Sequence, residues 1–195
     1  VAAIALCQAQ VAQAQACLAP DDVTDAGIYA IPVVADGIDA LIAQGIADPN
    51  RLYITGGSAG GIAAAYAIGL TDRFKAAVVA KPVVNWVSKV LTADSGIGQI
   101  ANQFPSLPWE TIDDYWRRSP LSLIPNMTTP TLLMTGEADR RTPISETEQM
   151  YQALKIQGIE VVMVRIPGSP HGIAGRPSRL IGKVENILAW FSRYP

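Results

Sequence analysis

Four short apolar segments constrain the fold of this chain more than any other feature, because they alternate with segments of helical periodicity. Each is apolar along most of its length, which is typical of strands buried on both faces in a parallel sheet. The expected strands are 51–55, 75–80, 131–135 and 160–166. The expected helices are 34–42, 60–70, 111–117, 145–157 and one after Ser178 with Ile181, Val184, Leu188 and Phe191 on one face. This alternation predicts an α/β fold, with a parallel sheet covered by helices on both sides.

The length and the charge of the chain limit what it can bind. Its 195 residues suit one domain, and we see neither an internal repeat nor a linker. Lys and Arg number 15 against 17 Asp and Glu, without a basic run, so no nucleic acid partner is expected. Because no stretch of about 18 consecutive apolar residues is present, we also expect no membrane-spanning helix and no membrane partner.

The first residues of the chain differ in composition from the rest. Residues 1–20 are rich in Ala and Gln and contain no charged side chain, which fits either a helix or the remnant of a signal peptide. An apolar stripe at helical spacing favours the helix; it consists of Ile4, Cys7, Val11, Ala14 and Leu18. Cys7 and Cys17 would lie about 15 Å apart along such a helix, too far for a disulfide. Two reduced cysteines and the lack of an intact signal sequence favour a cytoplasmic protein.

A serine lies in a glycine-rich turn between an expected strand and an expected helix. The segment Gly56-Gly-Ser58-Ala-Gly-Gly61 fits the pattern G-x-S-x-G, in which a very tight turn exposes the serine hydroxyl above the sheet. Side chains two residues before and after the serine would collide in such a turn, and Gly56 and Gly60 satisfy this requirement. The alternative is a serine that only caps the following helix. A phosphate-binding loop is not expected, because no Gly-Lys-Ser/Thr follows.

Two further expected strands end in residues that such a serine would need. Asp139 follows the strand 131–135, and His171, the chain's only histidine, follows the strand 160–166. Side chains beyond the carboxyl ends of parallel strands meet in one crevice, and the order Ser, Asp, His is that of the α/β-hydrolase triad. His171 would take the proton of Ser58, and Asp139 would orient the imidazole. One histidine and two cysteines do not suffice for a zinc site, and no cofactor or metal is expected.

Simpler interpretations of the same residues stay open at this point. Asp139 could form a turn or an ion pair with Arg140 or Arg141, and Glu137 competes for the carboxylate role. A histidine in a loop rich in Gly and Pro is often only a surface residue. Three residues in the right order, each after an expected strand, favour the triad.

These residues belong to a longer run of motifs that resembles the catalytic domain of the prolyl oligopeptidase family, in its acylaminoacyl-peptidase and dipeptidyl-peptidase-like branch. The likeness covers residues 36–194. It rests on Asp39-Ala-Leu-Ile, Asp48-Pro-Asn-Arg-Leu, Thr55-Gly-Gly-Ser-Ala-Gly-Gly, Thr71-Asp-Arg-Phe-Lys-Ala-Ala, Asn85-Trp, Tyr115-Trp-Arg-Arg-Ser-Pro, Thr129-Pro-Thr-Leu-Leu, Gly136-Glu-Ala-Asp-Arg-Arg-Thr-Pro and Pro167-Gly-Ser-Pro-His-Gly. We therefore divide the chain into an unassigned N-terminal segment, 1–35, and an α/β-hydrolase domain, 36–195.

The resemblance implies a serine hydrolase that cleaves amide or ester bonds of small peptide, acylamide or ester substrates. It implies the triad Ser58, Asp139 and His171, and it selects Asp139 over Glu137. It also implies that the backbone N–H of Ala59, where the family usually has Tyr, donates to the oxyanion of the reaction.

The sequence departs from the family in what precedes the matching region. The β-propeller and the first strands of the hydrolase domain, with the second oxyanion donor, have no counterpart here. We therefore expect the serine-bearing strand to form an exposed sheet edge. That edge would be covered by the missing half of a longer enzyme or by a second copy of the chain. A catalytically weak or inactive interaction module is the alternative function.

Aromatic residues between the second and third expected strands are the candidates for substrate binding. The family builds its acyl pocket in this segment, and the candidates are Trp86, Trp109 and Trp116. The alternative for each of them is an ordinary place in the aromatic core.

Overall fold

The computed structural model of the chain describes residues 26–195. The expected N-terminal helix and the separation of Cys7 and Cys17 lie outside the described residues. The helix α2, Ala26–Ala43, begins earlier than the expected helix 34–42. The proposed division of the chain between residues 35 and 36 therefore falls within one helix, and that division stays a prediction.

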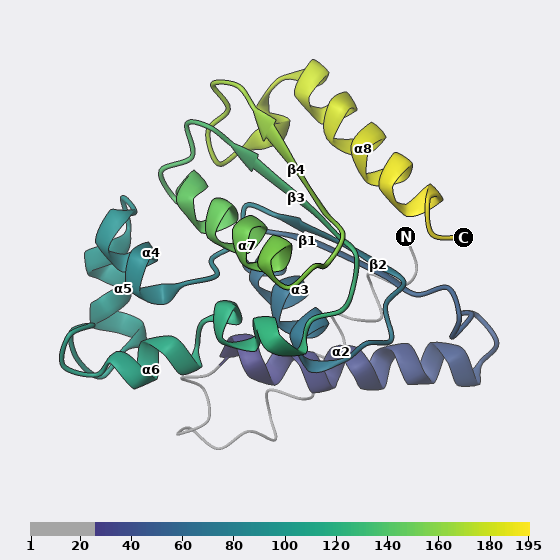
Figure 1. Cartoon of the computed structure of the whole chain (residues 1–195), viewed down its shortest axis with the longest axis horizontal. Helices are drawn as coiled ribbons and strands as arrows, with labels where there is room; N and C mark the ends of the chain where they lie inside the picture. The colour runs from purple at the N-terminus through teal and green to yellow at the C-terminus, as the bar shows by residue number, and fades with distance from the viewer. Residues whose placement is uncertain (1–25) are drawn as a thin grey trace.

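The predicted parallel sheet is confirmed, with all four strands close to their expected positions (Figure 1). The strands are β1 (Tyr53–Gly57), β2 (Ala76–Ala80), β3 (Thr131–Gly136) and β4 (Val161–Ile166). Their order in the sheet follows their order in the chain, and every neighbouring pair is parallel. The carboxyl ends of all four strands therefore lie at one edge of the sheet.

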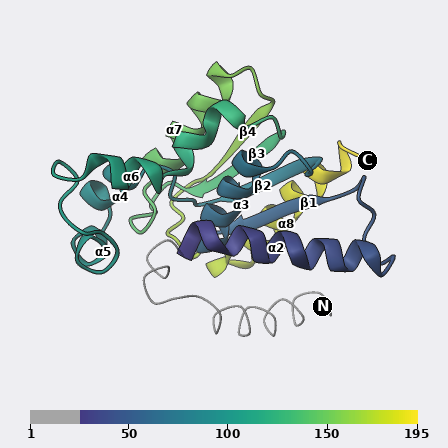
Figure 2. The same cartoon turned by 90° about the horizontal axis from the view of Figure 1, so that it is seen from below.

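Helices cover both faces of this sheet because alternate side chains of the central strands point to opposite sides. On β2, Ala77 and Val79 pack into the core beneath α3 (Ala59–Leu70) and α7 (Ile144–Ile156). Ala76, Val78 and Ala80 pack on the other face against Trp190 of α8 (Pro177–Ser192). Seen from below, α2 runs alongside α3 (Figure 2). The two central strands, β2 and β3, are buried along their whole length, whereas β1 and β4 at the ends of the sheet are partly exposed.

The segment between β2 and β3 forms an arm beside the sheet, which Figures 1 and 2 both show. It contains α4 (Trp86–Thr92), α5 (Gly96–Gln103), α6 (Ile112–Arg117) and the 3-10 helix η2 (Pro120–Asn126). The arm has its own small core, made of Val90, Phe104 and Tyr115. A short 3-10 helix, η3 (Ile173–Gly175), follows β4.

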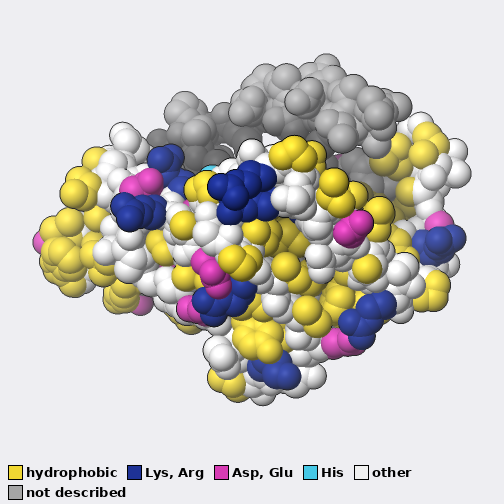
Figure 3. All heavy atoms as spheres, turned by 90° about the horizontal axis from the view of Figure 1, so that it is seen from above, with side chains coloured by type: hydrophobic (Ala, Val, Ile, Leu, Met, Phe, Trp, Pro, Cys, Tyr) yellow, Lys and Arg dark blue, Asp and Glu magenta, His cyan; other side chains and the backbone are white. Residues whose placement is uncertain are grey.

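Two surfaces of the described structure expose apolar groups. The strand β1 lies at the end of the sheet, with β2 as its one paired neighbour among residues 26–195. On α8, most of the apolar face expected from the sequence is exposed, at Ile181, Val184 and Leu188. The helix packs on the sheet through Ile187, Trp190 and Phe191 instead. Figure 3, which views the molecule from above, shows hydrophobic side chains spread among charged ones.

No helix in the described part of the chain is both long enough and apolar enough to cross a membrane.

Candidate active site

Ser58 lies in the turn between β1 and α3, with φ 59° and ψ −119°. Positive φ is uncommon for a residue with a side chain, and here it belongs to a tight turn of the kind that exposes a serine hydroxyl at the end of a sheet. The hydroxyl makes no capping hydrogen bond to α3, so the alternative of a simple helix cap is wrong.

Glycines make this turn sterically possible, although one of them is not the expected one. A Cβ atom on Gly56 would lie 2.0 Å from the carbonyl oxygen of Gly60, and one on Gly61 would lie 2.5 Å from that of Ala80. Both positions therefore require glycine. The same atom on Gly60 would meet nothing within 4 Å. The expectation that Gly60 is the second required glycine is wrong, because Gly61 is the residue that packs against β2.

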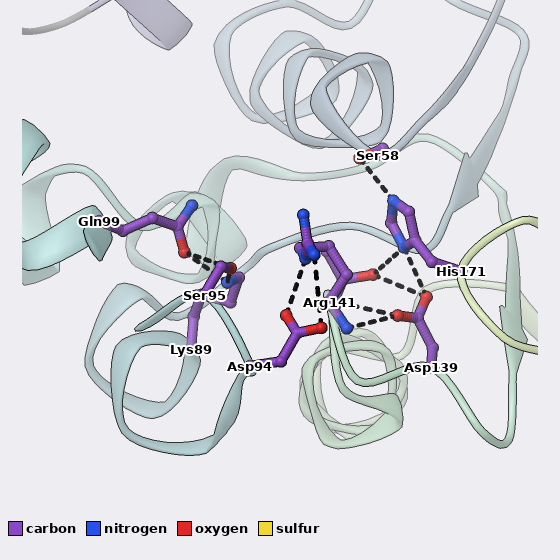
Figure 4. A network of polar contacts seen from close by, with 9 residues as sticks. Ser58, Lys89, Asp94, Ser95, Gln99, Asp139, Arg141 and His171 are labelled. Carbon is purple, nitrogen blue, oxygen red and sulfur yellow. Dashed lines mark hydrogen bonds and ion pairs between the residues drawn. The ribbon is translucent and has the colours of Figure 1, made fainter. Parts of the chain in front are cut away.

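His171 joins Ser58 to Asp139 (Figure 4). Its Nε2 lies 2.9 Å from Ser58 Oγ, and its Nδ1 lies 2.8 Å from Asp139 Oδ2. The carboxylate of Asp139 is buried and also accepts hydrogen bonds from the backbone N–H groups of Arg141 and Thr142 and from the Thr142 hydroxyl. An acceptor on the Nδ1 side favours the tautomer that carries its proton there, which leaves the Nε2 lone pair free to accept the serine proton.

Asp139 does form a turn, as one alternative expected, since its Oδ1 accepts from the backbone N–H groups of Arg141 and Thr142 while Oδ2 contacts the imidazole. The expected competition from Glu137 and the ion pair with Arg141 do not match the structure. The Glu137 carboxylate is exposed and accepts a hydrogen bond from Arg165 Nε at 3.2 Å. The Arg141 guanidinium pairs with Asp94, its Nε lying 2.7 Å from Asp94 Oδ1, and not with Asp139. The carboxylate beside the imidazole is therefore that of Asp139.

The loops that bear Asp139 and His171 are packed directly against each other. A Cβ atom on Gly136, at the end of β3, would lie 2.2 Å from the carbonyl oxygen of Ser169. That carbonyl accepts a hydrogen bond from the backbone N–H of Ala138 at 3.0 Å. The close approach, which glycine permits, fixes the distance between the two loops and so between the carboxylate and the imidazole.

Ala59 occupies the first position of α3, where a backbone N–H has no acceptor within the helix. The helix dipole adds partial positive charge at this end. The expected role of the Ala59 N–H as an oxyanion donor stays a prediction.

Lys81 is a member of the site that the sequence analysis missed. It follows β2 directly, and its Nζ donates to the carbonyl oxygen of His171 at 2.6 Å. Burial lowers the pKa of Lys81, and the nearby carboxylate of Asp139 opposes this shift. The rule that located Ser58, Asp139 and His171 could have found Lys81 as well, because each of these four polar residues follows the carboxyl end of one strand.

A second polar cluster lies between the arm and the triad (Figure 4). The buried ammonium of Lys89 donates to Ser95 and Gln99, which joins α4 to α5. The backbone N–H of Asp94 donates to the carbonyl oxygen of Arg140, and its carboxylate pairs with Arg141. The arm is thereby attached to the loop that bears Asp139. Among residues 26–195, no group of three or more His, Cys, Asp or Glu side chains is placed to hold a metal ion.

The three tryptophans expected to bind substrate occupy different environments. Trp86 is half-buried and packs against Phe104, with ring centroids 5.5 Å apart. Trp109 is 69% exposed, and Trp116 lies at a groove formed by α6, η2 and α7. The residues that line this groove include Leu121, Ile124, Gln149 and Ala153 but no member of the triad. A substrate-binding role of these tryptophans stays a prediction.

Comparison with known sequences identifies relatives of this chain. The prolyl oligopeptidase family matches residues 25–195. The chain is 38% identical over 149 residues to a Bacillus subtilis protein named uncharacterized peptidase YuxL, covering 75% of this chain and 23% of the relative. It is 34% identical over 165 residues to the acylamino-acid-releasing enzyme of Arabidopsis thaliana, covering 80% and 22%.

Solved structures show the same architecture. The acylaminoacyl peptidase of Pyrococcus horikoshii matches with a TM-score of 0.79 at 27% identity, covering 84% of this chain and 27% of that one. A puromycin-hydrolyzing peptidase of Mycobacterium tuberculosis matches with a TM-score of 0.74 at 30% identity, covering 82% and 24%. The chain thus spans about a quarter of the length of the proteins that it matches.

Proposed function

The chain belongs to the prolyl oligopeptidase family, and from this premise we propose that it is a serine hydrolase that forms an acyl-enzyme at Ser58. The observation that carries the proposal is the pair of contacts made by His171, at 2.9 Å to Ser58 Oγ and 2.8 Å to Asp139 Oδ2. These are the contacts that a nucleophile, a general base and an orienting carboxylate require.

The geometry supports a two-step reaction. Ser58 Oγ attacks the substrate carbonyl carbon while His171 Nε2 accepts the serine proton, and the backbone N–H of Ala59 donates to the developing oxyanion. Collapse of the tetrahedral intermediate breaks the amide or ester bond, and His171 returns the proton to the leaving group. Water then attacks the acyl-enzyme with the same base, which releases the acid and restores Ser58.

The proposed substrates are small acylated amides, peptides or esters. The names of two relatives support the acyl and peptide classes, since they are an acylamino-acid-releasing enzyme and an acylaminoacyl peptidase. Simple esters are the easiest of these substrates, because an alkoxide or phenoxide leaving group needs less help from a general acid than an amine does. Trp86, Trp109 and Trp116 are the proposed aromatic contacts for the acyl group.

Active-site labelling tests this function without a guess at the substrate. A fluorophosphonate should modify the purified protein covalently, and peptide mapping should place the label on Ser58. The Ser58→Ala variant should lose the label, and His171→Ala should slow labelling strongly because the serine is no longer activated. A folded protein that resists the reagent would contradict the proposal.

The position of β1 supports a second candidate, a non-catalytic module that binds another chain through the open edge of the sheet. An exposed strand edge offers unpaired backbone donors and acceptors to a further strand. The occupant would be a second copy or another segment of a longer enzyme. Binding that survives Ser58→Ala in a protein without labelling would favour this function.

We propose that the protein is cytoplasmic, because its two cysteines are expected to stay reduced and disulfides are typical of oxidising compartments. Cell fractionation would test this.

A further inference from the structure

We propose that Lys81 is a positioning residue that holds the backbone of His171 and so places the imidazole between Ser58 and Asp139. The inference rests on the proposed function and deepens it. The observation behind it is the hydrogen bond from Lys81 Nζ to the carbonyl oxygen of His171, at 2.6 Å.

The backbone of Lys81 adopts a conformation that a lysine would not adopt without a compensating contact. Its φ is 42°, in the left-handed region that favours glycine, and its own N–H donates to the carbonyl oxygen of Met134 on β3. A side chain makes this conformation sterically unfavourable, because its Cβ comes close to the following carbonyl oxygen. Glycine would relieve the strain, but it would remove the ammonium that reaches His171.

The contact fixes the backbone of a loop whose other anchors lie two residues to either side of His171, at buried Ser169 and Ile173. His171 lies between Pro170 and Gly172, and Gly168 begins the turn with φ 58°. The carbonyl of Ser169, two residues before His171, accepts a hydrogen bond from Ala138 in the loop that follows β3. The carbonyl of His171 itself accepts only the lysine and the local N–H of Ile173 among residues 26–195. Lys81 thus provides the hold from β2, while Asp139 holds the ring.

The side chain of Lys81 is guided toward this carbonyl by its surroundings. Its Cε lies beside Gly57, where a Cβ atom would be 3.4 Å away. The charged groups that act on the ammonium are Asp139 and Lys183, of opposite sign. A hydrogen bond from a charged donor is roughly twice as strong as a neutral one.

Two variants separate a positioning role from a structural one. Lys81→Gly removes the ammonium and relieves the backbone strain, so its melting temperature should equal or exceed that of the unmodified protein. Lys81→Met keeps the length of the stem without the donor. On a short chromogenic ester, both should lower kcat between about 10-fold and 100-fold, with KM changed less than about twofold. Lys81→Arg should recover most of kcat.

The matched control is Lys75→Met, the same substitution just before the opposite end of β2. Lys75 is exposed, and its backbone N–H, which methionine retains, donates to the carbonyl oxygen of Leu52 just before β1. Its kcat should be unchanged. Folded Lys81→Gly and Lys81→Met proteins with unchanged kcat would overturn the proposal, as would a rise in KM at constant kcat, which would make Lys81 a substrate contact.

A measurement without turnover distinguishes failure of this inference from failure of the proposed function. His171 is the only histidine in the sequence, so its Nδ1 proton is the only histidine ring N–H signal expected from Nδ1 in the NMR spectrum. We expect this proton to exchange with water at least tenfold faster in Lys81→Gly and Lys81→Met than in Lys75→Met. Equal exchange rates would overturn the inference even if Ser58 is labelled. Faster exchange in a protein that resists the fluorophosphonate would leave the positioning role in place and contradict the hydrolase function.

Discussion

The backbone of Gly60 passes so close to Gly56 that a Cβ atom on Gly56 would lie 2.0 Å from the Gly60 carbonyl oxygen. This contact closes the turn around Ser58, and it involves backbone on both sides, so neither partner can move away without unwinding the start of α3. The reverse position is different, because a Cβ atom on Gly60 meets no heavy atom within 4 Å.

We therefore expect Gly56→Ala to lower the free energy of unfolding by about 3 kcal/mol, the upper end of the usual cost of overpacking. Gly60→Ala should cause no loss, because its methyl group would enter open space. Urea denaturation of the two variants measures the difference. Equal stabilities would contradict the close approach of the two glycines.

Asp139→Asn should leave the fold intact and lower kcat on the order of 10⁴-fold. The asparagine amide can donate to Nδ1 and so favour the tautomer whose Nε2 carries a proton, which cannot accept the proton of Ser58. Steady-state kinetics on an ester measures this effect. Glu137→Gln is the control, since the exposed Glu137 pairs with Arg165 outside the site and its loss should leave kcat unchanged. A similar fall of kcat in both variants would contradict the assignment of Asp139 as the carboxylate that orients His171.

The hydroxyl of Thr142 donates to Asp139 Oδ2 at 3.0 Å and lies 3.3 Å from His171 Nδ1. Thr142→Val keeps the shape of the side chain but deprives a buried carboxylate of one donor. Loss of a hydrogen bond to a charged group costs about 1.5–3 kcal/mol, so we expect that decrease in the free energy of unfolding. Thr142→Ser keeps the hydroxyl and should lie closer to the unmodified protein. The order of the three stabilities in urea denaturation is the test.

The central strands were predictable because burial on both of their faces requires side chains that are apolar along most of the strand. Val78 and Val79 point to opposite sides of the sheet, and both are fully buried, so the segment must be apolar throughout. The bounds of α4 and α5 could not be predicted, because contacts between the two helices stabilise them, such as that of Lys89 with Gln99. On α8, the face that carries the buried Trp190 packs on the sheet, and most of the apolar stripe expected from the sequence does not.

Within the site, the meeting of the three triad side chains was predictable, and the backbone contacts that hold them in place were not. Ser58, Asp139 and His171 could be located because each follows a strand. The requirement for Gly61 could not, since it depends on the approach of β2 at Ala80. The role of Lys81 could not be predicted either, because neither a lysine nor its neighbours in the sequence indicate the positive φ at this position.

Glu146 lies fully buried at the start of α7 and connects that helix to the segment after β2. Its Oε2 accepts hydrogen bonds from the backbone N–H groups of Val84 and Asn85 at 3.0 and 2.9 Å, and Oε1 accepts one from Ser88. Burial raises the pKa of Glu146, although these donors and the nearby Lys89 act in the opposite direction. In the folded protein this carboxyl therefore binds its proton more tightly than in the unfolded chain.

This shift predicts how stability depends on pH. Where the folded state binds more protons than the unfolded state, the free energy of unfolding falls as pH rises. The contribution of Glu146 is thus fully present below its ordinary pKa, about 4.3, and is lost as pH rises through the higher pKa of the folded state. Glu146→Gln removes this dependence, because glutamine does not titrate.

Urea denaturation at pH 4, 5, 6 and 7 should show the stability of the unmodified protein relative to Glu146→Gln decreasing with pH. Glu185→Gln, at an exposed site on α8, controls for the loss of one carboxylate. A relative stability that increases with pH would show that the hydrogen-bond donors outweigh burial at Glu146.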